Sequence, residues 1–259
     1  MDPISIFKKE RKETLEAYSQ DDSFHSLSSK WRSESMRKRY VYNFDWLGRP
    51  IIQYPQDMQA VQEVIWQTRP TLIIETGIAH GGSLIFSASM LAMLDISEAV
   101  EKGEVYDPKK SKRKVIGIDI DVRQHNRKAI QNHPMSNWIE MVEGSSVSEE
   151  TIAKVKGLSF GHERVIVCLD SMHTHDHVLQ ELNAYAELVT KDCYCIVFDT
   201  FVEDVEDGFF EDRPWDVGNN PKTAVHEWLK SNQHFEIDKD LENKLMITVC
   251  PDGFLKRVR

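Results

Sequence analysis

Residues 71–83 read TLIIETGIAHGGS, and this stretch decides the fold. Its first half is an apolar run rich in β-branched residues, which predicts a buried strand. Its second half is a turn with three glycines, and residues 84–94 then carry apolar side chains at helical spacing. A strand, a glycine-rich turn and a helix in direct succession predict a parallel α/β unit whose turn can approach a ligand closely.

The same alternation continues along the chain. Further apolar runs, separated by stretches of helical periodicity, lie at residues 115–119, 138–142, 165–170 and 193–199. This order predicts right-handed crossovers and a mostly parallel sheet with helices on both faces. The last two runs, 235–237 and 245–249, are separated by seven residues too polar and too few for a crossover, and predict an antiparallel hairpin. The pattern resembles the Rossmann-like, seven-stranded α/β sheet of methyltransferases.

Two regions are expected in the chain. Residues 1–55 are charged with scattered aromatics and predict a helical extension that packs on the core or on a partner subunit, which indicates a homo-oligomer. Residues 56–259 predict the α/β domain. Two segments are expected to lie outside its core: residues 95–114, which are charged and flexible, and residues 202–222, which are rich in Asp, Gly, Pro and Asn.

Composition limits the classes of partner. Lys and Arg total 32 against 42 Asp and Glu, a formal net charge of -10, which argues against a nucleic-acid partner. The N-terminal residues contain no apolar stretch of the length that a signal peptide or membrane span requires. We therefore expect a cytoplasmic protein with no membrane span, whose four cysteines are reduced and buried.

The glycine-rich turn indicates the kind of ligand. GIAHGG differs from the GxGxxG spacing that dinucleotide enzymes use for a pyrophosphate. Glu75, expected at the mouth of the turn, would repel a phosphate but would suit the cationic amino and sulfonium groups of S-adenosylmethionine. The residues predicted to contact this cofactor are Glu75, Thr76, Gly77, Ala79, His80, Gly81, Gly82 and Ser83.

The next two strand ends offer groups for the rest of a nucleoside. Asp119 ends the second strand, where an acid can accept hydrogen bonds from both ribose hydroxyls, and Asp121, beyond Ile120, is a competitor. The third strand is followed by polar groups that could meet the adenine, although an ordinary turn explains them almost as well: Gly144, Ser145 and Ser146.

The densest polar cluster follows the fourth strand, in DSMHTHDH at residues 170–177. Asp170 and Asp199 end neighbouring strands, and oxygen ligands from two strand ends can converge on a hard cation such as Mg²⁺. His173 is then placed to take a proton from a substrate hydroxyl. Alternatively, His173 and His177 join Asp170 in a two-histidine, one-carboxylate site for Fe(II), typical of an oxygenase.

Together these motifs resemble the cephalosporin hydroxylase-like family, which is similar to rhamnosyl and macrocin O-methyltransferases. The matching segments extend from about residue 46 to residue 257 and include WLGRPIIQYPQDM, IIETGIAHGGS, VIGIDID, VEGSS, LDSMHTHDHVLQELNAYAELV, VFDT, WDVGNNPKTAVHEWL and KLMITVCPDGFLKR. The resemblance implies an S-adenosylmethionine-dependent and Mg-dependent O-methyltransferase. Its acceptor would be a sugar hydroxyl of a surface polysaccharide, glycolipid or glycosylated natural product.

The turn also looks like the ELGxxxGxS turn of catechol-type, Mg-dependent methyltransferases. That likeness implies Asp170 as a ligand of the metal, next to the cofactor, and His173 as the base. Relatives carry two adjacent acidic or amide ligands at the fifth strand end, where this chain reads VFDT. Thr200 is the candidate for the missing ligand, with Glu203 or water as alternatives.

Two further alternatives remain at this point. The chain could be an Fe(II)-dependent hydroxylase that uses Asp170, His173 and His177, or a non-catalytic scaffold that retains the cofactor pocket. The segment from Trp215 to Thr223 looks like part of a loop that covers the substrate, and a structural Ω-loop is equally compatible with it.

Overall fold

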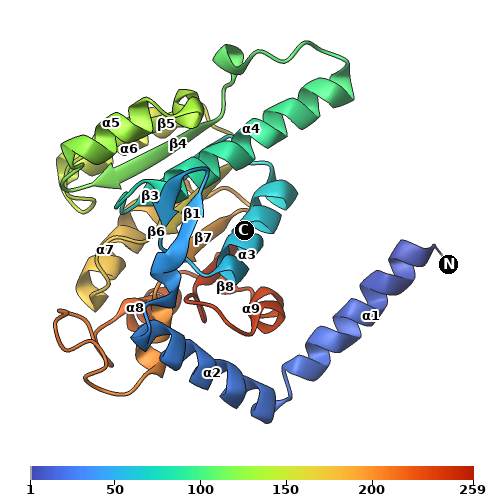
Figure 1. Cartoon of the computed structure of the whole chain (residues 1–259), viewed down its shortest axis with the longest axis vertical. Coiled ribbons are helices and arrows are strands. Elements are labelled where there is room, and N and C mark those ends of the chain that lie inside the picture. The colour runs from blue at the N-terminus through green and yellow to red at the C-terminus, as the bar shows by residue number, and fades with distance from the viewer. Residues whose placement is uncertain (1) are drawn as a thin grey trace.

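A computed structural model describes residues 2–259. Among these residues the main sheet has seven strands in the order β5-β4-β3-β6-β7-β9-β8 (Figure 1). The first five strands along the sheet are parallel, whereas β9 is antiparallel to both β7 and β8. The Rossmann-like fold is therefore confirmed. The strands are β3 (Leu72–Thr76), β4 (Lys114–Asp119), β5 (Ile139–Glu143), β6 (Val165–Leu169), β7 (Tyr194–Val197), β8 (Phe235–Ile237) and β9 (Phe254–Arg257).

Helices cover both faces of this sheet. Every residue of the central strands β3, β6 and β7 is buried, which explains their continuous apolar runs. The chain moves from β3 to β5 in one direction and from β6 to β7 in the other, so right-handed crossovers place α4 and α7 on opposite faces. The helices are α3 (Pro55–Thr68), α4 (Gly82–Lys102), α5 (Gln124–Gln131), α6 (Glu149–Ser159), α7 (His175–Tyr185) and α8 (Pro221–Leu229), with short 3-10 turns at η2 (Pro108–Lys110), η3 (Pro134–Trp138), η4 (Ala186–Leu188) and η5 (Thr200–Asp204).

The N-terminal region is helical and then joins the core. Helix α1 (Pro3–Tyr18) has no buried residue, passes beside α9 (Lys239–Leu245) and projects from the body of the molecule (Figure 1). Helix α2 (Asp22–Arg37), η1 (Tyr40–Asn43) and the hairpin of β1 (Phe44–Trp46) and β2 (Arg49–Ile51) follow, with the hairpin packed on α4. A division of the chain at residue 55 stays a prediction.

The C-terminal hairpin forms with a different partner strand from the one predicted. Strand β8 matches the predicted run at 235–237, but residues 239–245 are α9, and the strand that pairs with β8 is β9 at 254–257. The run 245–249 instead begins at the last residue of α9 and continues as an irregular segment, in which Met246 and Ile247 are half-buried and Thr248 and Val249 are buried. The buried carboxylate of Asp57 accepts hydrogen bonds from the Thr248 hydroxyl and, at 3.0 Å, from the Val249 amide.

Helix α4 is longer than predicted. It continues to Lys102, so the segment 95–114, expected to be flexible, begins with two further helical turns. These turns are held by ion pairs, since Arg113 bridges Asp95 at 2.6 Å and Glu98 at 2.5 Å. Within residues 2–259, α4 is also the one helix long and apolar enough to cross a membrane. Ten of its residues are buried against the sheet and the β1–β2 hairpin, and this packing accounts for its composition.

Candidate functional site

The site lies where the strand order reverses, at the carboxyl ends of β3 and β6. The backbone leaves β3 at Gly77 and β6 at Asp170, and the two segments touch. Gly77 has a φ of +87°, and a Cβ atom there would lie 2.0 Å from the Asp170 carbonyl oxygen. No other residue fits this position, which brings the glycine-rich turn and the acidic strand end together.

Asp119 fixes the shape of the glycine-rich turn. Its carboxylate, at the end of the adjacent β4, accepts hydrogen bonds from the amides of Ile78 at 2.8 Å and Ala79 at 3.3 Å. Ala79 has a φ of 45°, which is unusual for a residue with a side chain, and Asn126 donates to its carbonyl oxygen at 2.8 Å. These contacts hold the turn open above the start of α4.

Glu75 lies beneath the turn and not at its mouth, as the sequence had suggested. The side chain is 3% exposed, and its carboxylate accepts a hydrogen bond from the Ser83 hydroxyl in the first turn of α4. Burial raises the pKa of Glu75 to about 7, against the opposing effect of that hydrogen bond. The Thr76 side chain is also buried, and its hydroxyl accepts a hydrogen bond from the Asp170 amide at 3.2 Å.

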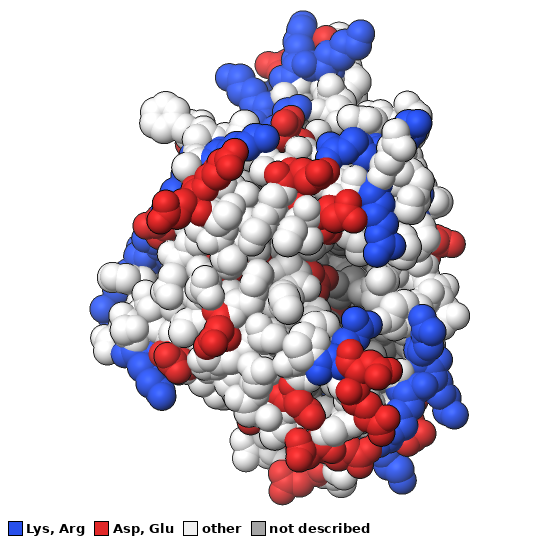
Figure 2. All heavy atoms as spheres, turned by 90° about the vertical axis from the view of Figure 1, so that its left-hand side faces the viewer, with Lys and Arg blue, Asp and Glu red and all other residues white. Residues whose placement is uncertain are grey.

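A cavity of about 530 Å³ opens beside the turn. Figure 2 shows a hollow on this face, with acidic atoms inside it and both basic and acidic side chains around it. Residues of the turn form one wall of the cavity, and the loop 205–220 contributes Phe210, Arg213 and Trp215 to another. Among the predicted cofactor residues, those lining this cavity are Gly77, Ala79, His80, Gly82, Ser83 and Asp170.

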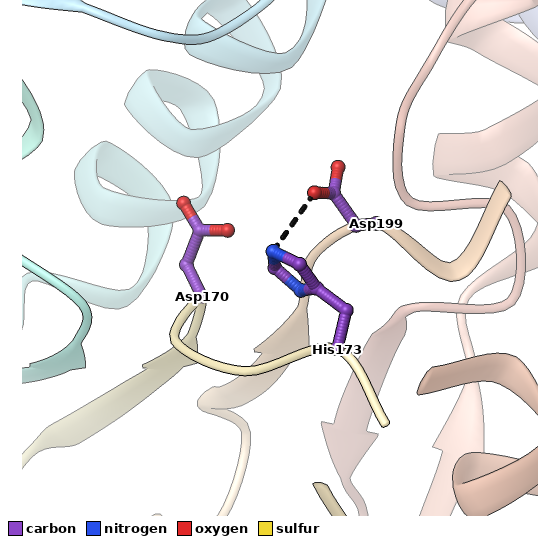
Figure 3. A group of neighbouring side chains, drawn as sticks. All are labelled: Asp170, His173 and Asp199. Carbon is purple, nitrogen blue, oxygen red and sulfur yellow. Dashed lines mark ion pairs between the residues drawn. The ribbon is translucent and has the colours of Figure 1, made fainter. Parts of the chain in front are cut away.

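Three side chains converge at the floor of the cavity. Asp170, His173 and Asp199 each bring one ligand-type atom within 4.8 Å of the others (Figure 3). Burial, and then the nearby Asp199 carboxylate, raise the pKa of Asp170 well above its usual value. Burial also raises the pKa of Asp199, while His173 acts in the opposite direction. Two acids this close repel each other unless a proton or a cation lies between them.

His173 connects this acidic pair with the covering loop. Its Nε2 atom lies 3.1 Å from Oδ2 of Asp199, as Figure 3 shows. Its ring packs edge-on against Trp215, with 4.8 Å between the ring centroids. Trp215 therefore reaches the floor of the site, and the loop 205–220 covers part of the cavity.

Comparison with known proteins identifies the family. The family model described as Rhamnosyl O-methyltransferase/CmcI matches residues 38–258. The chain belongs to the rhamnosyl O-methyltransferase/CmcI family. It is therefore an S-adenosylmethionine-dependent sugar O-methyltransferase by family, which confirms both the resemblance seen in the sequence and the predicted class of enzyme.

Individual relatives agree with this assignment. The rhamnosyl O-methyltransferase of Mycobacterium tuberculosis is 25% identical over 233 residues, covering 87% of this chain and 84% of the relative. The rhamnosyl O-methyltransferase of Mycobacterium leprae is 26% identical, covering 87% and 90%. A CmcI structure described with Mg and S-adenosylmethionine has a TM-score of 0.56 at 18% identity, covering 84% of this chain and 78% of that chain. This structural likeness concerns the fold.

Other predicted ligands of this methyltransferase are engaged elsewhere. The Thr200 side chain is fully buried, and its hydroxyl donates to the Val249 carbonyl at 3.4 Å. Glu203 accepts hydrogen bonds from the Gly218 amide at 2.8 Å and from the side chain of Asn220. Asp170, His173 and Asp199 are thus the predicted residues that the structure brings together, while Thr200 and Glu203 bond to other segments.

The remaining histidines of the cluster also have other partners. His177 Nε2 lies 3.1 Å from the Ser146 hydroxyl, 3.2 Å from the Ser171 hydroxyl and 3.4 Å from a Glu181 oxygen. In the part of the chain that the structure describes, His177 is absent from the group that could hold a metal. No observation supports the Fe(II) hydroxylase. His175 bonds to Thr223 at 2.8 Å within the α7–α8 contact.

The predicted ribose and adenine residues lie along the ends of β4 and β5. Among the described residues none of them lines the 530 Å³ cavity. Ile120 is 74% exposed and Asp121 is exposed, whereas Ser146 is buried and its carbonyl accepts a hydrogen bond from Tyr185. Gly144 has a φ of +151° and packs against Thr151. Ile120 thus offers an apolar surface beside Asp119.

One polar residue of the site was missed by the sequence reasoning. Gln53, between β2 and α3, is 7% exposed, and its amide nitrogen donates to Oδ2 of Asp170 at 3.2 Å. Its oxygen Oε1 is buried and has no hydrogen-bond partner among the described residues. A buried amide oxygen normally finds a donor, so this one indicates room for a ligand. The only signal in the sequence is a polar side chain within the apolar stretch IIQY.

Proposed function

We propose that this chain transfers a methyl group from S-adenosylmethionine to a sugar hydroxyl with the help of a bound divalent cation, Mg²⁺. The observation that carries the proposal is the convergence of Asp170, His173 and Asp199 within 4.8 Å at the floor of a cavity. That floor adjoins the glycine-rich turn, so one cavity offers both a nucleoside-binding turn and a group suited to move a proton.

The donor atoms at the floor suit a hard cation. Asp170 and Asp199 supply carboxylate oxygens, the ligands that Mg²⁺ prefers, and water would complete the octahedral sphere. Burial raises the pKa of both acids, and the nearby Asp199 carboxylate raises that of Asp170 further, a repulsion that a cation would relieve. A CmcI structure is described with Mg. Asp170 and Asp199 would hold the ion, with Thr200 the remaining candidate among the predicted ligands.

His173 is proposed as the general base. A bound cation would orient the acceptor hydroxyl and lower its pKa. The imidazole Nε2 would take the hydroxyl proton as the oxygen attacks the methyl carbon and the carbon–sulfur bond breaks. The Asp199 carboxylate, 3.1 Å away, would stabilise the positive charge that the ring gains. Trp215, packed edge-on against the ring, fixes its orientation and keeps water from one side.

The cofactor is proposed to extend from the glycine-rich turn toward β4 and β5. Glu75, beneath the turn, would attract the cationic end of the cofactor, and Asp119 would accept the ribose hydroxyls once its hydrogen bonds to the turn rearrange. Ile120, 74% exposed, would pack on the adenine, with Gly144, Ser145 and Ser146 at the edge of that ring. CmcI structures are described with S-adenosylmethionine and with its demethylated product.

The acceptor class is proposed from the relatives. Curated relatives are named rhamnosyl O-methyltransferases, so we propose a sugar in a surface polysaccharide, glycolipid or glycosylated natural product. We also propose that the enzyme works in the cytoplasm and as a homo-oligomer.

Calorimetric titration separates this proposal from its rivals. S-adenosylmethionine and its demethylated product should bind, NAD should not, and transfer of a labelled methyl group to rhamnosides should stop with EDTA and resume with Mg²⁺. Binding of the cofactor without transfer to any sugar would favour a non-catalytic role. Transfer that continues unchanged in EDTA would remove the cation from the proposal.

A further inference from the structure

We propose that the acceptor carries a diphosphate group, which Arg39 and Arg213 bind at the rim of the cavity. This inference rests on the proposed function and narrows its substrate class. It starts from the charges along the cavity, which change sign between floor and rim. The floor holds the carboxylates of Asp170 and Asp199, whereas Arg39 and Arg213, which line the same cavity, are exposed.

These two arginines are exposed and lack acidic partners. Within residues 2–259, neither Arg39 nor Arg213 has a carboxylate oxygen within 4.0 Å in an ion pair, although the net charge of the chain is -10. Arginines close by in the chain that do not line the cavity are paired. Arg32 lies 3.4 Å from Asp204, and Arg37 lies 3.0 Å from Glu34 and also pairs with Glu206.

Each unpaired guanidinium rests on an aromatic ring. The Arg39 guanidinium carbon lies 4.8 Å from the centroid of the Tyr42 ring, and that of Arg213 lies 5.3 Å from the Trp215 ring. Stacking restrains the guanidinium and leaves its N–H donors free in the plane of the group. Arg39 is held further by a left-handed backbone conformation, with a φ of 56°. Both side chains are thus restrained before any ligand binds.

A planar guanidinium with free donors matches a phosphate group, which can accept two parallel N–H bonds from it. Trp215 links Arg213 to the reacting end of the site, because its ring contacts both the Arg213 guanidinium and the His173 ring. An acceptor could therefore place its sugar hydroxyl at His173 and its anionic group at the rim.

The shared chemistry of such acceptors is a sugar joined to a diphosphate. The diphosphate could belong to a nucleoside diphosphate sugar or to a lipid-linked glycan precursor. The cofactor's own carboxylate is the competing partner for these arginines. The two residues belong to the segment before η1 and to the loop 205–220, and not to the glycine-rich turn itself.

Calorimetry on Arg39→Gln and Arg213→Gln tests the inference. The titrations use enzyme saturated with S-adenosylhomocysteine and freed of metal with EDTA, so that a bound cation cannot hold the phosphate. Uridine diphosphate, farnesyl diphosphate and inorganic diphosphate are the probes. Each substitution should weaken diphosphate binding by about tenfold, because it removes a charge-assisted hydrogen bond. Tighter binding of uridine diphosphate would indicate a nucleoside diphosphate sugar as the acceptor, and tighter binding of farnesyl diphosphate a lipid-linked precursor.

Arg11→Gln, on the exposed helix α1, is the matched control and should bind every probe like wild type. Salt should weaken diphosphate binding and leave S-adenosylhomocysteine binding unchanged. The inference is overturned if no diphosphate binds or if both cavity variants bind diphosphate like wild type. It is also overturned if the variants lose affinity for S-adenosylhomocysteine by the same factor as for diphosphate. If neutral glycosides were methylated at the same rate by wild type and by both arginine variants, this inference alone would be overturned. If no sugar were methylated, the proposed function would be overturned.

Discussion

His173 is the residue on which the proposed chemistry depends most directly. Its Nε2 lies between two carboxylates, 3.1 Å from one of them, at the floor of the cavity (Figure 3). We expect His173→Ala to lower the rate of methyl transfer by about 10²- to 10⁴-fold, the usual contribution of a general base. Affinity for S-adenosylhomocysteine should change little. Radiolabel transfer and calorimetry measure the two quantities.

His175→Ala is a suitable control for that substitution because its ring bonds to Thr223 and Glu227 and does not line the cavity. It should retain a rate within about threefold of wild type. If His173→Ala also stayed within about threefold, the role of His173 as base would have to be abandoned.

Gln53 is expected to position Asp170. Its amide donates to the Asp170 carboxylate at 3.2 Å, and such outer partners commonly change metal affinity by about 10- to 100-fold when they are removed. Gln53→Ala should therefore weaken Mg²⁺ binding by at least about tenfold in a calorimetric titration, whereas Gln59→Ala, on the exposed side of α3, should not. Equal Mg²⁺ affinity in the two variants would show that Gln53 does not position a ligand.

At the level of elements, the β3–α4 turn tolerates no side chain at its first glycine. Gly77→Ala would place Cβ 2.0 Å from the Asp170 carbonyl oxygen at a φ of +87°. We expect this substitution to lower the free energy of unfolding in urea by more than about 2 kcal/mol and to abolish S-adenosylhomocysteine binding. Gly157→Ala, in α6, meets no atom within 4 Å and should stabilise by about 0.5–1 kcal/mol. Comparable stability of both variants would contradict the close contact.

Asp57 joins α3 to the segment 248–250, and its pKa makes this joint sensitive to pH. Burial raises that pKa from 3.8 to about 7 despite hydrogen bonds from Thr248 and Val249. In the unfolded chain Asp57 ionises first, so stability should fall as pH rises from about 4 to 7 and then level off. The slope from this group reaches at most ~1.4 kcal/mol per pH unit.

Asp57→Asn should reduce that slope in urea unfolding measured between about pH 5 and 7. Part of the slope should remain in this variant, because the pKa of Glu75 is also raised to about 7. The exposed Asp207→Asn serves as the control and should leave the slope unchanged. An identical slope in wild type and Asp57→Asn would mean that this carboxyl does not titrate as described.

The elements that sequence patterns predicted well are those whose burial is uniform. Strands β3, β4, β6 and β7 were predicted because sheets covered on both faces demand continuous apolar runs. Strand β5 was predicted from a shorter apolar run, of which only Val142 is buried. The run 245–249 was misleading because Leu245 ends α9 and the residues after it pack as an irregular segment, half-buried at Met246 and Ile247 and buried at Thr248 and Val249. Strand β9 ends in Lys256 and Arg257, so its pattern is too short and too charged to predict a strand.

Sequence patterns predicted only those residues of the candidate site that the order of the strands brings together. Strand ends that share an edge bring Asp170 and Asp199 together, and a short loop adds His173. Gln53 comes from a segment before the sheet begins, and its contact with Asp170 is a tertiary one that no local pattern indicates. The burial of Glu75 beneath the turn likewise depends on how α4 packs, which a strand-end position does not reveal.

At the scale of the whole molecule, helix α1 leaves apolar surface uncovered. Ile4, Ile6 and Phe7 are 60%, 42% and 60% exposed, and on α2 Leu27 is 63% exposed. Surface of this kind is typical of contacts between subunits. We expect light scattering to give a mass at least twice the 30.0 kDa of one chain. Removing residues 1–18 should lower that mass, and a full-length mass of about 30 kDa would exclude self-association.

The contact between Gly77 and the Asp170 backbone has a thermodynamic consequence. The loop proposed to receive the nucleoside and the strand end proposed to receive the ion share a boundary with no free space, so neither can shift without displacing the other. Occupancy of one half should alter the affinity of the other, and by the same factor in both directions. Binding of the cofactor and binding of the cation would then be coupled, so that the site becomes complete for the acceptor only when both are bound.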